Sequence, residues 1–195
     1  MKVAKRTFEE DLEMAVAFHG HLCAGQILGT RIARIGLVHF GIEEPERYRD
    51  LIAFVEADRC LADAVCSVAR CNIGRRRLKW FDYGKMAATF YDIASDSAIR
   101  VSSVSQARPE PGEDIVEFYA RFPDAEFFRV EDVVVNIDQF DLPGKPLAHA
   151  VCEECGERVL DNRHVLHAGR VLCKACSGQP VYYRPLAAGR MAADA

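Results

Sequence analysis

The chain has 195 residues, half of them hydrophobic, and a formal net charge of −4. This length allows one sizeable core with a small appendage, because domains usually contain roughly 100–150 residues. The near balance of charges is not typical of proteins that coat nucleic acid or anionic membranes, and the sequence has neither the apolar run of a membrane span nor that of a signal peptide. We therefore expect a cytoplasmic protein that binds neither nucleic acid nor membrane.

Two helices are expected in the first forty residues. Thr7 and Glu10 have the spacing of a capping box, and apolar residues then recur at helical intervals as far as Val16. The pattern breaks at residues 19–23, which read His-Gly-His-Leu-Cys. A second apolar stripe then continues to Leu37.

Strands and shorter helices alternate in the middle of the chain. Branched and aromatic residues predict strands at 51–57, 79–83, 87–93, 98–104 and 127–136, with helices at 58–69 and 114–122. Residues 141–146 contain Pro and Gly and read as a linker. The predicted fold class is α+β, with helices packed on a β-sheet in a core domain at 1–145. A four-cysteine zinc-finger domain is expected at 146–186 and a disordered tail at 187–195.

The cysteines near the carboxyl end have the spacing of a zinc site, C-x2-C-x17-C-x2-C. They are Cys152, Cys155, Cys173 and Cys176. Two intervening residues form a tight turn that lets both sulfurs reach one ion, Gly156 tolerates the positive φ of such a turn, and the spacer is long enough for a hairpin. We predict one structural zinc ion, which stabilises so small a domain, over the alternative of two redox pairs. Because four thiolates close the site, His164 and His167 are expected at the surface.

A second cluster lies at the break between the two predicted helices. In an extended loop His19, His21 and Cys23 would point to one side, and imidazole and thiolate ligands suit zinc, nickel or copper ions. Cys23 would begin the next helix, where the helix dipole favours a thiolate. Cys60 stands where a buried strand turns into a helix, and Asp63, one turn on, could orient a ligand or take a proton. The alternative is that these residues only cap and pack a helix junction.

Four further features concern Lys85, the arginine run at 75–77 and two more cysteines. Lys85 could act as an acid–base group, although lysines at strand edges are usually only solvated. The run at 75–77, Arg-Arg-Arg, could hold an anion or form a solvated basic turn. Cys66 is expected to be a small buried hydrophobe. Cys71 can approach Cys60 only if the helix ends before it, because one straight helix would place the two roughly 16 Å apart.

These motifs resemble those of the FmdE family, named after the FmdE component of formylmethanofuran dehydrogenase. Family members carry F-H-G-H-L-C-P-G, which residues 18–25 match with Ala24 in place of proline. The family blocks E-T-D-x-C-x-x-D-A, G-C-T-x-G-K-G-N-L and D-Y-G-K-x-A are matched at many positions within residues 56–87. Some members end in a zinc finger of the C-E-x-C-G-E type, which residues 152–157 reproduce. The sequence also departs from the family at 69–70 and 75–77.

The resemblance implies an α+β core that forms an intertwined homodimer, with the zinc finger packed in the assembly. It also implies that His21, Cys23 and Cys60 line a metal-binding cleft, with His19 near it. The family name refers to an operon for molybdenum- or tungsten-dependent formylmethanofuran oxidation. No molybdopterin-binding signal is present in the sequence.

Three functions are compatible with these features. The first is a metal-binding accessory or regulatory protein related to the FmdE component of formylmethanofuran dehydrogenase, which senses or delivers a transition metal or recruits a protein partner. The second is a metal-dependent enzyme for a one-carbon or thiol-containing substrate, with candidate catalytic residues Cys23, Cys60, Asp63 and Lys85. The third is a zinc-ribbon regulator, for which the near-neutral carboxyl-terminal segment favours a protein partner over nucleic acid.

Overall fold

The computed structural model describes residues 5–183, which divide into two compact units. The core unit comprises residues 5–138 and 142–144, and the cysteine unit comprises residues 139–141 and 145–183. The predicted tail at 187–195 lies outside the described residues, and the predicted domain boundaries remain a prediction. Among residues 5–183, no helix is both long enough and apolar enough to cross a membrane.

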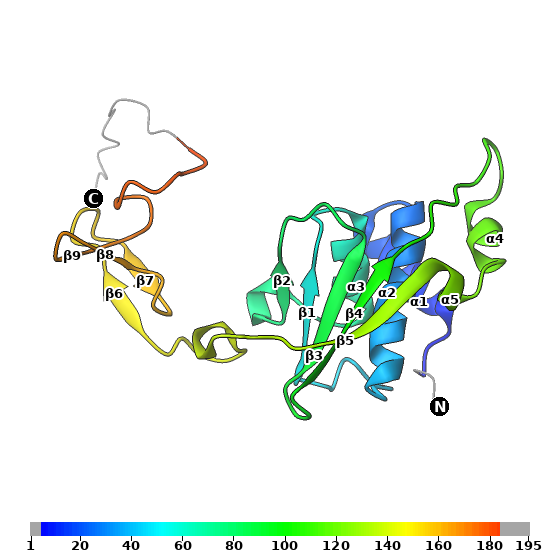
Figure 1. Cartoon of the computed structure of the whole chain (residues 1–195), viewed down its shortest axis with the longest axis horizontal. Coiled ribbons are helices and arrows are strands. Elements are labelled where there is room, and N and C mark those ends of the chain that lie inside the picture. Colours follow the sequence, from blue (N-terminus) through cyan, green and yellow to red (C-terminus); the bar gives the residue numbers. More distant parts are fainter. Residues whose placement is uncertain (1–4, 184–195) are drawn as a thin grey trace, which may run out of the picture. The chain divides into compact units, whose positions relative to one another are not determined.

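The core unit is a five-stranded sheet with helices gathered on one face (Figure 1). The strands are β1 Leu51–Val55, β2 Leu78–Trp80, β3 Ala87–Asp92, β4 Ser97–Ser103 and β5 Phe128–Val133, in the order β2-β1-β3-β4-β5. The β1–β2 pair is parallel and the other pairs are antiparallel. The helices are α1 Phe8–His19, α2 Ala24–His39, α3 Cys60–Val68, α4 Ile115–Ala120 and α5 Asp124–Phe127, with a 3-10 turn, η1, at Ile73–Arg75. The predicted α+β class is confirmed.

The first helix begins and ends as local chemistry dictates. The Thr7 hydroxyl accepts a hydrogen bond from the Glu10 amide, and the Glu10 carboxylate accepts one from the Thr7 amide, which confirms the predicted capping box. At the other end Gly20 takes the left-handed conformation, with φ +97°, that terminates many helices. His19 is therefore the last residue of α1 and Cys23 is the N-cap of α2. The predicted break between the two helices is present, except that His19 lies in α1 and not in the loop.

Glycines of helix α2 let its backbone pack closely against α3 and β3. A Cβ on Gly29 would lie 2.7 Å from the Ala64 Cβ of α3, and one on Gly36 would lie 2.6 Å from the Phe90 ring of β3. One turn earlier in each helix, Gly25 of α2 lies against Cys60 of α3. The contacts therefore advance in the same direction along both helices, so α2 and α3 run parallel. This close packing brings the amino-terminal ends of the two helices together.

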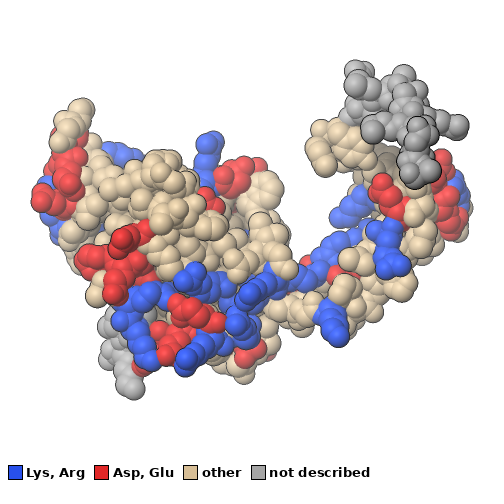
Figure 2. Space-filling model, turned by 180° about the vertical axis from the view of Figure 1, so that it is seen from behind, with Lys and Arg blue, Asp and Glu red and all other residues tan. Residues whose placement is uncertain are grey.

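The other face of the sheet has a smaller apolar cluster and a charged pair. Ile52, Tyr91 and Ala98 are buried there. Arg100 donates from Nε and Nη2 to the two carboxylate oxygens of Glu56, at 2.6 and 2.8 Å. On the surface viewed in Figure 2, Lys and Arg side chains of the core unit lie among Asp and Glu side chains.

The segment after α3 is built into the core. Arg77 is only 2% exposed, and its guanidinium donates to the carbonyl oxygens of Tyr48, Leu51 and Arg70 at 2.9, 3.2 and 3.0 Å. The expectation of a solvated or anion-binding turn is therefore wrong for Arg77, whereas Arg75 is exposed.

Two cysteines take structural positions around this segment. Because α3 ends at Val68, Cys71 is off the helix, where it is fully buried and its thiol lies 3.5 Å from the Leu51 carbonyl oxygen. Cys66 is half-buried, rather than buried as predicted, and accepts a hydrogen bond from Asn72.

The cysteine unit consists of two short hairpins and a 3-10 turn, η2 Gln139–Asp141. β6 His149–Val151 pairs with β7 Arg158–Leu160, and β8 Val165–His167 pairs with β9 Arg170–Leu172, all antiparallel. The amide of Glu153 donates to the Val171 carbonyl oxygen at 2.9 Å, which joins the first hairpin to the second.

Candidate metal centres

The hairpins of the cysteine unit bring its four cysteines together. The sulfurs of Cys152, Cys155, Cys173 and Cys176 all lie within 4.8 Å of one another. Cys152 and Cys173 directly follow β6 and β9, and each begins a turn closed by a backbone hydrogen bond. In the first turn Gly156, at φ +76°, donates its amide to the Cys152 carbonyl oxygen. The tight turn expected from the sequence is present.

This donor set fits a soft divalent ion. Hydrogen bonds from backbone amides, of which that of Cys155 has the largest effect, lower the pKa of Cys152 to about 6. The hydrogen bond with the Cys173 thiol raises the pKa of Cys176 to about 12. Four thiolates cannot all be charged at this separation unless a cation offsets their repulsion. The cluster could therefore hold a metal such as zinc, which prefers four tetrahedral sulfur ligands.

The two histidines of the spacer are not part of this cluster. His167 is exposed, as expected. His164 is half-buried instead, and its Nδ1 is buried without a hydrogen-bond partner among the described residues.

A second cluster forms where the ends of three helices meet in the core unit. Ligand atoms of His19, Cys23 and Cys60 lie within 4.8 Å of one another. His19 ends α1, Cys23 caps α2 and Cys60 opens α3. A Cβ on Gly25 would lie 2.7 Å from the Cys60 Cβ and 3.7 Å from the Cys23 sulfur, so a residue without a side chain is needed for this approach.

The imidazole of His19 has one nitrogen engaged and one without a partner. Its Nδ1 lies 2.8 Å from Oδ2 of Asp63, one turn into α3. Its Nε2 is buried and has no hydrogen-bond partner among the described residues. Metal-binding histidines commonly show this arrangement, in which a carboxylate holds one nitrogen and the ion takes the other. Burial, followed by the hydrogen bond with Cys23, raises the pKa of Cys60.

The structure distributes the remaining predicted site residues differently. His21 is outside the three-residue cluster, although its ring centroid lies 4.6 Å from that of His19. His21 lines the pocket that opens beside this cluster, as the resemblance implies, whereas His19 is the histidine whose ligand atom lies among the two thiols. Lys85 is exposed and lines a different pocket, with its Nζ 5.8 Å from the centre of the Tyr83 ring. It is not brought to the cluster.

A pocket of about 530 Å³ opens beside His19 and Cys60. Its wall combines apolar side chains of β1, η1 and β2 with the charged side chains of Asp58 and Arg59. Trp80, 51% exposed, belongs to this wall and was not predicted as a site residue. The available signal was its place in the sequence: the single tryptophan of the chain stands in a short strand that pairs with β1.

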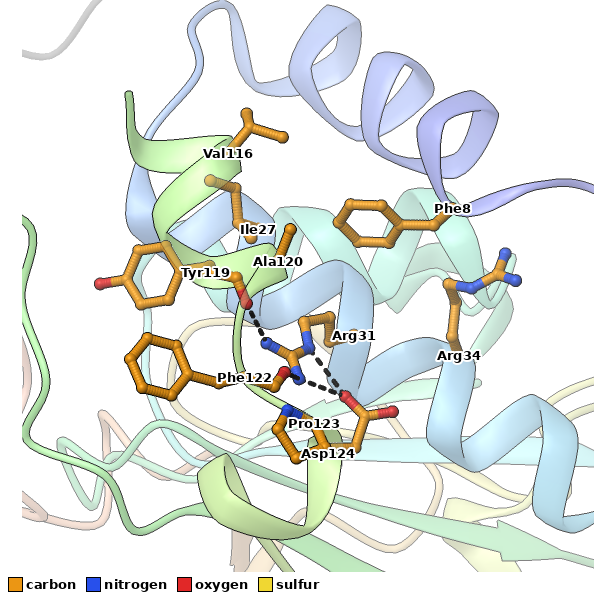
Figure 3. Close-up of a pocket in the computed structure, with 10 residues that line it drawn as sticks. All are labelled: Phe8, Ile27, Arg31, Arg34, Val116, Tyr119, Ala120, Phe122, Pro123 and Asp124. Carbon is orange, nitrogen blue, oxygen red and sulfur yellow. Dashed lines mark hydrogen bonds and ion pairs between the residues drawn. The ribbon is translucent and has the colours of Figure 1, made fainter. Parts of the chain in front are cut away.

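Another pocket, of about 370 Å³, lies between α2 and the α4–α5 segment (Figure 3). The guanidinium of Arg31 donates to the carbonyl oxygens of Tyr119 and Phe122 at 3.0 and 2.8 Å and to Asp124 at 2.7 Å. Because these acceptors belong to the chain itself, Arg31 fastens α4 and α5 to α2. We assign this pocket a structural role.

Comparisons with known proteins agree with this description. The family model described as "FmdE, Molybdenum formylmethanofuran dehydrogenase operon" matches residues 18–130. A curated relative from Archaeoglobus fulgidus, named probable S-adenosyl-L-methionine-binding protein, is 34% identical over 90 residues. These residues make up 45% of this chain and 25% of that protein, so the chain spans about a quarter of the relative's length.

A solved structure has a similar fold. The crystal structure of a tungsten formylmethanofuran dehydrogenase FmdE-like protein from Syntrophus aciditrophicus matches with a TM-score of 0.57 and 21% identity. The match covers 91% of this chain and 97% of that one. At this identity the likeness concerns the fold alone.

The mixed fold and the clustered cysteine and histidine ligands define a metal-binding protein. The family match covers more than half of the chain, including the three core-cluster residues. The chain belongs to the FmdE family.

Proposed function

We propose that this protein is a metal-binding accessory or regulatory protein with two different sites. The four cysteines of the cysteine unit would hold structural zinc. His19, Cys23 and Cys60 would hold an exchangeable transition metal. The observation that carries the second site is the buried, unpartnered Nε2 of His19, whose ring is held by Asp63 within a group that includes two thiols.

The core site has the composition of an open site rather than a closed one. One imidazole and two thiolates are three ligands, which leave a fourth tetrahedral position for an exogenous ligand. The pocket of about 530 Å³ beside His19 and Cys60 gives such a ligand room. When bound, the metal would supply a Lewis-acidic centre, while Asp63 orients the imidazole.

The positions of the acid–base candidates Asp63 and Lys85 agree better with metal binding than with catalysis. Asp63 is the candidate that reaches the cluster, and its Oδ2 is engaged by His19. Lys85 lies in another pocket. A role in sensing or delivering the metal therefore agrees better with the described residues than proton transfer at a reacting substrate does.

Small-molecule binding at the core site is a second candidate. The apolar wall with Trp80, together with the charged Asp58 and Arg59, suits a ligand with an aromatic or apolar body and charged groups. The name of the Archaeoglobus fulgidus relative makes S-adenosyl-L-methionine the first compound to test. Saturable binding that Trp80→Leu weakens and Trp80→Phe largely keeps would support this candidate, whereas equal binding by the wild type and Trp80→Leu would oppose it.

We retain homodimerisation, with a protein partner and a cytoplasmic location, as proposals drawn from the resemblance and the composition. Sedimentation velocity of the full chain tests the dimer directly. A dimer mass over a wide concentration range supports it, and a monomer mass throughout contradicts it.

The single tryptophan reports on the core site. Because Trp80 shares a pocket with His19 and Cys60, binding of Co²⁺ at the core cluster should quench its fluorescence. Cys60→Ser should weaken this quenching by about tenfold or more in metal concentration, because a thiolate ligand is lost. Cys66→Ser, at a half-buried cysteine outside the cluster, is the matched control. Equal quenching in wild type, Cys60→Ser and Cys66→Ser would contradict the proposed site.

A further inference from the structure

A pocket of about 460 Å³ at the ends of β3 and β4 has a different chemistry from the metal site. Its wall includes Lys85, Arg100 and Arg108 together with Ser102, Ser103 and Ser105, and no Asp or Glu lines it. We propose that this pocket binds a small organic anion through its carboxylate or phosphate group. The proposal does not depend on metal binding.

Lys85 and Arg108 have hydrogen-bond donors that are free to bind an anion. Within residues 5–183, Lys85 has no carboxylate in ion-pair distance, and its Nζ lies over the Tyr83 ring at 5.8 Å from its centre. Arg108 donates from Nη1 to the carbonyl oxygen of the preceding residue at 3.0 Å and has no ion-pair partner among the described residues. Both side chains can therefore form charge-assisted hydrogen bonds with an oxyanion.

Arg100, the third cation, is neutralised by a carboxylate and has a structural role in the pocket wall. Arg100 is paired through two hydrogen bonds with Glu56, which is 7% exposed. The backbone of Glu56 also holds the segment that carries Lys85: its carbonyl oxygen accepts from the Lys85 amide at 3.0 Å, and its amide donates to the Ala87 carbonyl oxygen at 3.0 Å. The backbone of Lys85 is thus anchored beside the pocket before any ligand arrives.

The serines add hydrogen-bond donors at the end of β4. The Ser105 Oγ accepts from the Ala107 amide at 3.2 Å, which leaves its proton available for an anion. Ser102, 8% exposed, and Ser103 make no side-chain hydrogen bond with the described residues. Hydroxyl donors together with Lys85 and Arg108, the two cations of the wall that have no carboxylate partner among the described residues, suit carboxylate or phosphate oxygens. The cavity also lies within the size range of small-molecule sites, so it has room for an organic body.

Calorimetric titration of the full, zinc-loaded chain tests this proposal with inorganic phosphate and phenyl phosphate as probes. Saturable binding of phenyl phosphate is expected, and Lys85→Gln or Arg108→Gln should weaken it by roughly tenfold or more, as loss of a charge-assisted hydrogen bond implies. Arg75→Gln removes the same charge from an exposed residue outside the pocket and should leave the affinity unchanged.

Three further measurements keep the result decisive. Ser102→Ala should also weaken binding, and circular dichroism should show each variant folded. Cys60→Ser should bind phenyl phosphate like the wild type, which separates this site from the metal site. Binding of inorganic phosphate alone, equal losses in Arg75→Gln and Lys85→Gln, or no saturable binding would each overturn the proposal.

Discussion

Nδ1 of His19, at the end of α1, lies 2.8 Å from Oδ2 of Asp63, one turn into α3. This contact joins residues 44 positions apart and sets the orientation of the imidazole. It leaves Nε2 as the nitrogen available to a metal. Such a carboxylate partner commonly strengthens metal binding by the histidine that it orients.

Asp63→Ala should therefore weaken metal binding at the core cluster by roughly 10–100-fold, the usual effect of losing such a carboxylate. Competition titration against a chromophoric chelator measures this affinity, with the metal site proposed for the cysteine unit as an internal reference. Asp58→Ala, which removes another carboxylate from the same pocket, is the control and should change the affinity little. Equal effects of the two substitutions would indicate general electrostatics instead of a specific contact.

Gly25→Ala should disturb the same cluster sterically. Its Cβ would lie 2.7 Å from the Cys60 Cβ and 3.2 Å from the Cys60 sulfur, so Cys60 must move. Gly29→Ala creates a comparable clash with Ala64, one turn further along α2. Both variants should lose about 1–3 kcal/mol of stability from overpacking, but only Gly25→Ala should lose metal affinity. Urea unfolding and Co²⁺ titration of the pair separate the two effects, and unchanged metal binding in Gly25→Ala would count against the cluster geometry.

Arg77→Met should destabilise the core unit by about 3 kcal/mol or more. The substitution leaves the carbonyl oxygens of Tyr48, Leu51 and Arg70 without their buried donor, and each unpaired group costs about 1–3 kcal/mol. Arg75→Met, at an exposed position in the same arginine run, should stay within about 0.5 kcal/mol of wild type. Denaturant unfolding measures the free energy of unfolding of both variants. Similar losses in the two variants would mean that the buried hydrogen bonds of Arg77 do not stabilise the core unit.

Stability should depend on pH through Asp92. Burial acts to raise the pKa of this carboxyl, but hydrogen bonds from Ser95 and Tyr48 outweigh burial and hold the pKa below 3.8. The ionised form therefore stabilises the fold above pH 3.8, and this contribution is lost as pH falls through the lower folded-state pKa.

Tyr48→Phe tests this coupling because it removes one of the hydrogen bonds that lower the pKa. The free energy of unfolding of this variant should fall less than that of wild type between pH 5 and pH 2. Tyr83→Phe, at a 62% exposed position, should behave like wild type. If Tyr48→Phe retains the full wild-type loss on acidification, the Tyr48–Asp92 bond is not the cause.

Features governed by short segments of sequence could be predicted. Thr7 and Glu10 are three residues apart, and the capping box depends only on that spacing and a helix after it. The two C-x-x-C pairs likewise act through local turns, and the spacer forms the hairpin that brings them together. The five strands predicted for the core unit lie within three residues of the observed bounds. The strand predicted at 127–136 begins one residue later than expected, because Phe127 ends the short helix α5.

Features governed by long-range contacts could not be predicted in this way. Whether His19 or His21 joins the thiols depends on the left-handed turn at Gly20 and on the place of Asp63 in another helix. Arg77 reads as part of a basic run, and its burial follows from carbonyl groups on distant parts of the chain. Trp80 lines the same pocket as His19 and Cys60, and it is placed there by the parallel pairing of β2 with β1.

Metal content measured per chain tests the two-site account most directly. Elemental analysis of protein purified without affinity metals and then loaded with Zn²⁺ should give two equivalents, of which a mild chelator removes one. Cys23→Ser and Cys60→Ser should each retain only the chelator-resistant equivalent, whereas Cys173→Ser should lose that one. A single equivalent in wild type that neither core substitution changes would contradict the account and leave His19, Cys23 and Cys60 as residues that only pack a helix junction.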